Sequence, residues 1–139
     1  MRNNTVFDCT IVNFAKIQNS SGNITVLENG SNISFDVKRI YYLYDIPGGE
    51  SRGGHAHYDL EQYIVAASGS FEVILDDGFN KKKVFLNRPN IGLHVVPGLW
   101  RKLDNFSSGS ICLVLASEHY TEKDYIRNYA DYKNYKNEK

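Results

Sequence analysis

The sequence predicts an all-β domain of the sandwich or barrel class, followed by one short C-terminal helix. Short runs of β-branched and aromatic residues recur about every 8 to 12 residues, the spacing typical of short antiparallel strands. Turn-forming Gly, Asn, Asp and Pro residues separate these runs. A length of 139 residues suffices for one hydrophobic core but not for two, so we expect a single domain over residues 1–139.

The expected strands share a high β-propensity and end at a turn. In chain order they are TIVNF (10–14), ITVLE (24–28), FDVKRIYYLYDI (35–46), EQYIVAAS (61–68), FEVIL (71–75), KKVFLN (82–87), IGLHVV (91–96) and SICLVLAS (110–117). The turns lie at residues 19–23, 47–49, 69, 76–78, 88–90 and 97–98. A jelly roll is one architecture that uses this many short strands.

Residues 121–139 follow a different pattern. Aromatic residues and one isoleucine recur there every three or four positions, with charged residues between them: Tyr125, Ile126, Tyr129, Tyr132 and Tyr135. This spacing places them on one face of an amphipathic helix, with Thr121 as its N-cap. We expect the helix to pack on the barrel or on a partner subunit.

The charge balance argues against two classes of partner. Lys plus Arg and Asp plus Glu both total 16, so the formal net charge is zero. Nucleic-acid and membrane-surface proteins usually carry a basic excess, so we expect neither partner. The one dense basic run, residues 81–83, follows a turn and is interpreted as the solvated side of a hairpin.

The N-terminal residues MRNNTVFDCT lack the apolar stretch of a signal peptide, and no segment approaches transmembrane length. We therefore expect a soluble, cytoplasmic protein. Its two cysteines, Cys9 and Cys112, lie far apart and outside any CxxC pattern. We expect both to be reduced and Cys112 to be buried in the apolar run ICLVLA.

The stretch RGGHAH, residues 52–57, carries the candidate chemistry. Alternate residues of a strand face the same side, so His55 and His57 are expected to project together. Two adjacent imidazoles allow three interpretations: metal ligands, a proton-transfer pair, or exposed polar residues at the end of a loop. The arginine and two glycines before them favour a binding role, because glycines permit close ligand approach and arginine binds phosphate through two donors.

The metal interpretation meets an incomplete ligand set. The first motif of metal-binding cupins is nearly reproduced by Gly49, His55, His57, Glu61 and Gly69. The second motif of these cupins supplies a third histidine after a Pro–Gly turn, but Arg101 and Lys102 follow Pro97 and Gly98 here, and a cation offers no lone pair. His94 precedes this turn. Because a catalytic metal site takes about three protein ligands, we predict no metal and no cofactor.

The second interpretation of the two histidines is a proton-transfer pair. An unperturbed pKa of about 6.5 suits histidine to moving protons at neutral pH. Two imidazoles on one inward wall, with a phenol and guanidinium groups nearby, suit a reaction that forms and discharges an enolate-like charge.

Eight segments, in one order along nearly the whole chain, form a specific combination. They are KRIYYLYD (38–45), RGGHAH (52–57), LEQ (60–62), ASGS (67–70), NRP (87–89), IGL (91–93), PGLWR (97–101) and LVLASEHYTEKDYIRNY (113–129). In these segments the chain resembles the dTDP-4-keto-6-deoxyglucose 3,4-ketoisomerases, small cupins of deoxysugar biosynthesis. The resemblance implies a single-domain cupin jelly-roll barrel that acts as a metal-free homodimer.

The resemblance also implies a reaction and its residues. The ketone of dTDP-4-keto-6-deoxy-D-glucose moves from C4 to C3 through a 3,4-enediolate, and a PLP-dependent aminotransferase then installs a 3-amino group. Acid/base roles fall to His55 and His57, and an active-site role falls to Tyr41. We interpret His57 as the residue that moves the carbon-bound proton, with His55 or Tyr41 handling the oxygen-bound protons.

Substrate contacts are expected from several further residues. Arg39 shares a strand face with Tyr41, two positions away. Arg52 and Arg101 are candidates for the pyrophosphate or the sugar, as is Arg127, although surface salt bridging is the commoner fate of an arginine. Trp100 either stacks on a flat group of the substrate or packs in the core.

Two positions bear on the configuration of the product at C4. Gluco-forming members of the family carry tyrosine and arginine at the positions of Ser21 and Arg101, whereas galacto-forming members carry arginine and histidine. Arg101 follows the gluco pattern and Ser21 follows neither, so we expect the gluco product. A serine is small enough to admit a water molecule as the source of the C4 proton.

The alternatives that stay open are the same reaction with a galacto product, a dTDP-sugar 3,5-epimerase, a non-catalytic cupin that binds nucleotide sugars, and a metal-dependent dioxygenase. The epimerases tend to be longer and pair a histidine with an aspartate, whereas two histidines are paired here.

Overall fold

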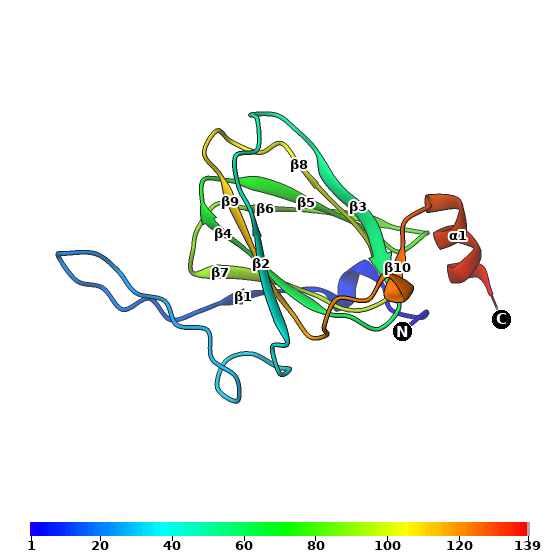
Figure 1. The fold of residues 1–139 in the computed structure, drawn as a ribbon, viewed down its shortest axis with the longest axis horizontal. Coiled ribbons are helices and arrows are strands. Elements are labelled where there is room, and N and C mark those ends of the chain that lie inside the picture. Colours follow the sequence, from blue (N-terminus) through cyan, green and yellow to red (C-terminus); the bar gives the residue numbers. More distant parts are fainter. Residues whose placement is uncertain (139) are drawn as a thin grey trace.

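The computed structural model describes residues 1–138, which form two five-stranded antiparallel sheets facing each other (Figure 1). The strands are β1 (Thr10–Asn13), β2 (Arg39–Leu43), β3 (Arg52–His57), β4 (Gln62–Ser68), β5 (Phe71–Asp76), β6 (Lys81–Leu86), β7 (Ile91–Val95), β8 (Trp100–Asp104), β9 (Ile111–Ala116) and β10 (Tyr125–Ile126). One sheet has the order β1-β7-β4-β9-β2 and the other β10-β3-β8-β5-β6. The all-β prediction, with one short C-terminal helix, is confirmed.

The main core fills the space between the sheets. On β5, Phe71, Val73 and Leu75 are fully buried, while the residues between them are partly exposed. This period of two is what a strand with one face on the core requires. The same alternation on the neighbouring strand β8 buries Arg101 and Leu103. The alternation of β8 therefore turns the cationic side chain of Arg101 into the barrel interior.

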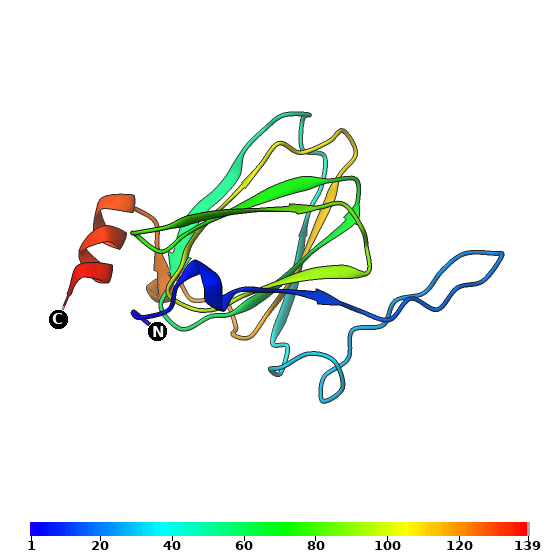
Figure 2. The ribbon, with the colours of Figure 1, turned by 180° about the vertical axis from the view of Figure 1, so that it is seen from behind.

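Residues 14–38 depart from the prediction. The expected strand at 24–28 is absent: Ile24 makes only an isolated bridge to Ile17, and the strand expected over 35–46 is confined to β2. The segment projects from the end of the barrel opposite the helix, as both views show (Figures 1 and 2). High β-propensity did not produce a strand here because a strand needs a paired neighbour, and these residues make only the isolated bridges Ile17–Ile24 and Asn29–Ile33.

The predicted C-terminal helix is wrong in extent. Helix α1 spans Tyr129–Asn137, and Asn128 is its N-cap, its side-chain oxygen accepting a hydrogen bond from the amide of Asp131. Thr121 instead precedes the 3₁₀ turn η2 (Glu122–Asp124) and makes no capping hydrogen bond. The intervening residues extend because β10 pairs with β3. Pairing with a sheet edge thus overrides the helical periodicity of this segment.

Helix α1 packs on the barrel of its own chain. Tyr132 is fully buried, and its hydroxyl lies 2.9 Å from the carbonyl oxygens of both Asp76 and Gly98. The helix thereby joins the β5–β6 hairpin to the turn before β8. No helix within residues 1–138 combines the length and apolar character needed to cross a membrane.

Two smaller predictions agree with the structure. Cys112 is buried on β9 and is a free thiol, as is Cys9. Burial raises the pKa of Cys112 to about 12. Of the basic run on β6, Lys81 and Lys83 are exposed.

Candidate active site

A cavity of about 460 Å³ opens beside β2 and β3 and is closed on one side by residues 120–127. Its charged lining consists of Arg39, Arg52, Arg101 and Arg127. These are four of the six arginines in the chain, and no Asp or Glu lines the cavity. Its volume suits a small-molecule site and its charge suits an anion, especially a phosphate or diphosphate.

Of the paired histidines of β3, His55 lines this cavity and His57 packs behind it. His55 is 8% exposed, and His57 is 4% exposed. Their ring centroids are 4.7 Å apart and the rings are nearly perpendicular. The Nε2 atoms of both are buried without a hydrogen-bond partner among the described residues. Because buried polar atoms are nearly always paired, these two nitrogens are where a ligand would complete the site.

Both imidazoles are held neutral. Burial lowers the pKa of His55 to about 2 and that of His57 to about 3, and the positive charge of Arg101 is the next largest cause for each. A neutral imidazole keeps a free lone pair, so at neutral pH each ring can accept a proton.

Tyr41, Gln62 and Arg101 form a closed ring of hydrogen bonds beside the histidines. Arg101 Nη2 and Gln62 Nε2 both donate to the Tyr41 hydroxyl at 2.9 Å, and Arg101 Nε donates to Gln62 Oε1 at 3.2 Å. The tyrosine oxygen accepts twice, so its own proton is free to be donated into the cavity. Arg101 is 2% exposed and forms no ion pair within residues 1–138.

Local backbone geometry explains one of the glycines before the histidines. Gly53 has a φ of +76°, and a Cβ there would lie 2.8 Å from Arg101 Nη1. The glycine therefore permits a close approach, as expected, but the group that approaches is the buried guanidinium.

Sequence reasoning missed Tyr125, which lines the cavity from β10. Its ring centroid lies 4.4 Å from that of His57 and 5.1 Å from that of His55, and its hydroxyl lies 3.5 Å from Arg39 Nη2. The register that pairs Tyr125 with His57 produces this contact. A strand at 125–126 was hidden by the tyrosine spacing that predicted a helix.

Arg127 and Tyr120 also lie at the cavity. The Arg127 guanidinium lies 4.2 Å from the centre of the Tyr125 ring and makes hydrogen bonds of 2.5 and 2.9 Å to Glu122. The Tyr120 hydroxyl contacts the same carboxylate. Arg127 thus combines the surface salt bridge and the cavity position that the sequence left as alternatives.

Two predicted substrate contacts lie elsewhere in this chain. Trp100 does not line the cavity; its ring packs against Tyr129 and Tyr132 of α1, at centroid distances of 5.2 and 5.8 Å. Ser21 is exposed on the projecting segment, where its amide bonds only to Asn19. The cavity of a single chain therefore includes neither residue.

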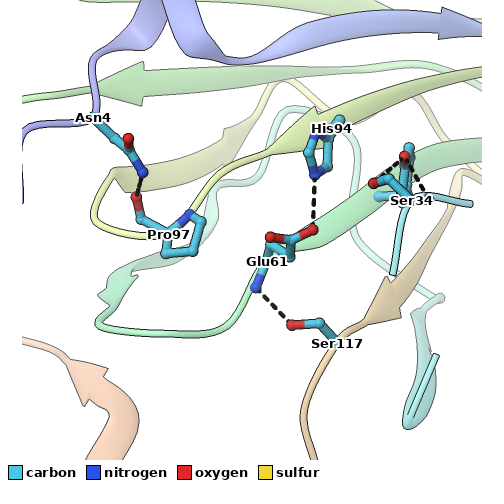
Figure 3. Close-up of polar contacts among 7 residues, drawn as sticks. Asn4, Ser34, Glu61, His94, Pro97 and Ser117 are labelled. Carbon is cyan, nitrogen blue, oxygen red and sulfur yellow. Dashed lines mark hydrogen bonds and ion pairs between the residues drawn. The ribbon is translucent and has the colours of Figure 1, made fainter. Parts of the chain in front are cut away.

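The other candidate ligands of the metal hypothesis, His94 and Glu61, bond to each other and not to the histidine pair. His94 Nε2 lies 3.2 Å from Glu61 Oε1 (Figure 3). The His94 ring stacks on Tyr63 at a centroid distance of 4.8 Å. Tyr63 belongs to a second cluster of apolar residues, separate from the main core. No group of three or more His, Cys, Asp or Glu side chains within residues 1–138 is arranged to hold a metal ion.

Comparison with known proteins identifies the family of the chain. The family model described as "FdtA: WxcM-like, C-terminal" matches residues 7–137. The chain belongs to this family. A curated relative from Aneurinibacillus thermoaerophilus, named TDP-4-oxo-6-deoxy-alpha-D-glucose-3,4-oxoisomerase, is 46% identical over 125 residues, which cover 90% of each chain.

Two solved structures of 3,4-ketoisomerases are similar to this chain in sequence and fold. A 3,4-ketoisomerase from Helicobacter canadensis is 45% identical, with a TM-score of 0.91 over 94% of this chain and 98% of the other. A structure named the WlaRB TDP-quinovose 3,4-ketoisomerase, from Campylobacter jejuni, is 43% identical, with a TM-score of 0.87 over 93% and 99% of the two chains. The cupin class expected from the sequence is thereby confirmed, and the chain is an isomerase.

Proposed function

We propose that this protein is a TDP-4-keto-6-deoxy-D-glucose 3,4-ketoisomerase. The observation that carries the proposal is a pair of buried, neutral imidazoles with free Nε2 atoms, beside a buried guanidinium without a carboxylate partner among the described residues. The 46% identical relative is named for this substrate and reaction.

The arginines account for binding of the nucleotide. A diphosphate carries two negative charges, and Arg39, Arg52 and Arg127 are the three lining arginines that reach partly or fully exposed parts of the cavity. Guanidinium groups bind phosphate oxygens through paired donors, so the diphosphate lies toward these residues and the sugar toward the histidines.

The reaction begins at C3, next to the C4 ketone. A neutral imidazole removes the C3 proton, the electrons of that bond form the C3–C4 double bond, and the carbonyl π electrons move to O4. Tyr41 donates a hydrogen bond to O4 while Arg101 supplies positive charge beside it, so the enediolate is stabilised where its charge develops. A preorganised donor of this kind contributes a factor of about 10²–10³ in rate.

In the second half of the reaction, the enediolate is protonated on the neighbouring carbon, C4. The proton of the C3 hydroxyl is transferred to O4, which leaves the charge on O3. Collapse of that charge forms the C3 ketone, and the imidazolium returns its proton to C4. Atoms and charge balance, and no oxidant or reductant is needed.

We propose roles for the two histidines that differ from those expected from the sequence. The sequence-based interpretation gave the carbon-bound proton to His57. His55 lines the cavity, whereas His57 lies behind it against Tyr125 and is the more buried of the two. We therefore assign the carbon-bound proton to His55 and the transfer between O3 and O4 to Tyr41, both of which line the cavity, with His57 packed behind them.

For the product we propose the gluco configuration. Arg101 occupies the position at which the resemblance associates arginine with this outcome, and the 43% identical Campylobacter jejuni protein is named for quinovose, the 6-deoxy sugar of glucose configuration. A 3-keto product of this kind is a substrate for a PLP-dependent aminotransferase that installs a 3-amino group.

The projecting segment supports the proposal of a homodimer. Residues 14–38 expose Ile17, Ile24 and Val26, each at least half accessible. The segment also carries Ser21, which does not line the arginine-rich cavity of its own chain. In a dimer that places this segment on a second copy, those side chains are covered and Ser21 is brought to the partner's site. The molar mass in solution, by light scattering, tests the dimer.

The reaction is tested with the purified protein and the 4-keto sugar in D₂O, followed by NMR. The expected result is migration of the carbonyl to C3, and the hydrogen delivered to C4 is deuterium in every turnover in which the imidazolium exchanges with solvent before returning it. Deuterium at C3 and C5 with the ketone kept at C4 indicates a 3,5-epimerase instead. Binding without exchange or migration indicates a non-catalytic sugar-binding protein. The configuration is decided by the coupling constants of H4 in a parallel reaction run in H₂O and aminated at C3.

A further inference from the structure

Gln62, the first residue of β4, lies beneath the cavity and is 1% exposed. Its amide makes two hydrogen bonds of opposite sense: Oε1 accepts from Arg101 Nε and Nε2 donates to the Tyr41 hydroxyl. Arginine only donates, so the oxygen must face Arg101 and the NH₂ group must face Tyr41. The three side chains fix one another in a ring, since Arg101 Nη2 also donates to Tyr41.

Only an amide satisfies both contacts without adding charge. A carboxylate of the same shape accepts but does not donate, so Tyr41 would have to turn its proton away from the cavity toward it. Such a carboxylate would also pair with Arg101, the usual arrangement for a buried arginine. With an amide in this place, the positive charge of Arg101 stays available to the cavity and the tyrosine proton stays available to a ligand.

We propose that Gln62 is a positioning residue of the proton-transfer reaction: its neutral amide orients the Tyr41 hydroxyl toward the substrate and keeps the charge of Arg101 uncompensated for the enediolate. Gln62 does not line the cavity, so it acts through its two partners. The inference rests on the proposed ketoisomerase function.

Gln62 also bears on the protonation of the histidines, through Arg101. The charged and titratable side chains around His55 and His57 are Arg39 and Tyr41 on β2, Arg101 on β8, Tyr125 on β10 and Arg127 after it. This set is cationic or neutral, so it favours neutral imidazoles. Glu122 pairs with Arg127 at the outer end of this set, so a carboxylate at position 62 would be the first acid bonded to Arg101.

The test uses the full-length variants Gln62→Glu and Gln62→Met, with Asn134→Asp as a control. Asn134 is exposed on α1, and its change adds the same charge away from the cavity. In Gln62→Glu we expect kcat to fall about 100-fold with KM changed less than about threefold, because a transition-state interaction is lost. We expect the acidic limb of kcat/KM to move up by about one pH unit, as an added opposite charge does to a nearby pKa.

Gln62→Met keeps the size but loses both hydrogen bonds and adds no charge. We expect a fall in kcat of about tenfold, as for loss of one positioned group, with the acidic limb unmoved. This second variant decides the positioning role if the glutamate variant does not fold, as judged by circular dichroism. Asn134→Asp is expected to match the wild type throughout.

Wild-type kcat and an unmoved acidic limb in a folded Gln62→Glu protein would overturn the inference. So would an unchanged kcat in Gln62→Met. Titration of the imidazoles by NMR in the ligand-free proteins separates this outcome from failure of the proposed function. A wild-type protein without ketoisomerase activity refutes the function, whereas equal imidazole titration in wild type and Gln62→Glu refutes the electrostatic role of Gln62.

Discussion

His55 and His57 destabilise the folded protein as the solution becomes acidic. In the unfolded chain each imidazole takes up a proton near its ordinary pKa of about 6.5. In the fold, burial lowers the pKa of His55 to about 2 and that of His57 to about 3. Between these limits the unfolded state binds more protons than the folded state, so stability is present above pH 6.5 and is lost as the pH falls.

The size of the loss follows from these values. Between pH 7 and pH 5 an unfolded histidine gains about 2 kcal/mol of protonation free energy, and the folded imidazoles gain almost none because their pKa values lie well below 5. Two such groups give a loss of about 4 kcal/mol, an upper limit because residual structure in the unfolded chain reduces it. This is a large fraction of the stability of a domain of this size.

Urea unfolding of the wild type and of the double variant His55→Asn/His57→Asn, at pH 7 and at pH 5, measures this contribution. Other titrating groups are common to both proteins and cancel in the comparison. We expect the free energy of unfolding of the variant to fall by up to about 4 kcal/mol less than that of the wild type over this interval. Equal losses in the two proteins would show that the histidines are not held neutral by the fold.

The remaining predictions concern activity. Because the pKa values of both histidines are lowered, kcat/KM for the free enzyme is expected to stay level down to about pH 5, where an ordinary histidine would be protonated; an acidic limb at pH 6.5 contradicts this. Gly53→Ala is expected to lower kcat/KM at least tenfold, since the new Cβ meets Arg101 at 2.8 Å, whereas Gly109→Ala, at the same φ of +76° but with open space around it, shows the backbone strain alone. Tyr125→Leu is expected to lower kcat about tenfold by loosening the imidazoles, and Tyr125→Phe, which keeps the ring contacts, is expected to retain most activity; equal loss in both would assign the effect to the hydroxyl.

The sequence predicted the position of a side chain correctly where that position depended only on the alternation of one strand. The alternation of β3 brought His55 and His57 to one side, and the alternation of β8 turned Arg101 inward while leaving Trp100 outside against α1. Sequence-based prediction failed where the position depended on which strand a segment pairs with. Tyr125 became part of the site because its segment pairs with β3, and local spacing does not encode which edge a short segment joins.

The inward orientation of Gln62 also could not be predicted from the sequence. Glu61 faces outward and pairs with His94, whereas Gln62 faces inward and bonds to Tyr41. Nothing in the local sequence predicts which of these two neighbours faces inward. That distinction needs the face of β4 to be known. The projecting residues 14–38 had strong strand propensity and lacked a partner strand in this chain.

The concentration of arginines in one cavity shapes how a ligand arrives. A chain whose formal charges sum to zero attracts an anion only weakly at long range. Arg127 is neutralised by Glu122, but Arg39, Arg52 and Arg101 have no ion-pair partner among residues 1–138 and create a local positive field at one opening. Such a field acts over about one Debye length, near 10 Å at 0.1 M salt, so capture of a diphosphate should slow steeply as ionic strength rises. Phosphate or sulfate buffers would occupy the same opening, and assays in a zwitterionic buffer would record the faster encounter.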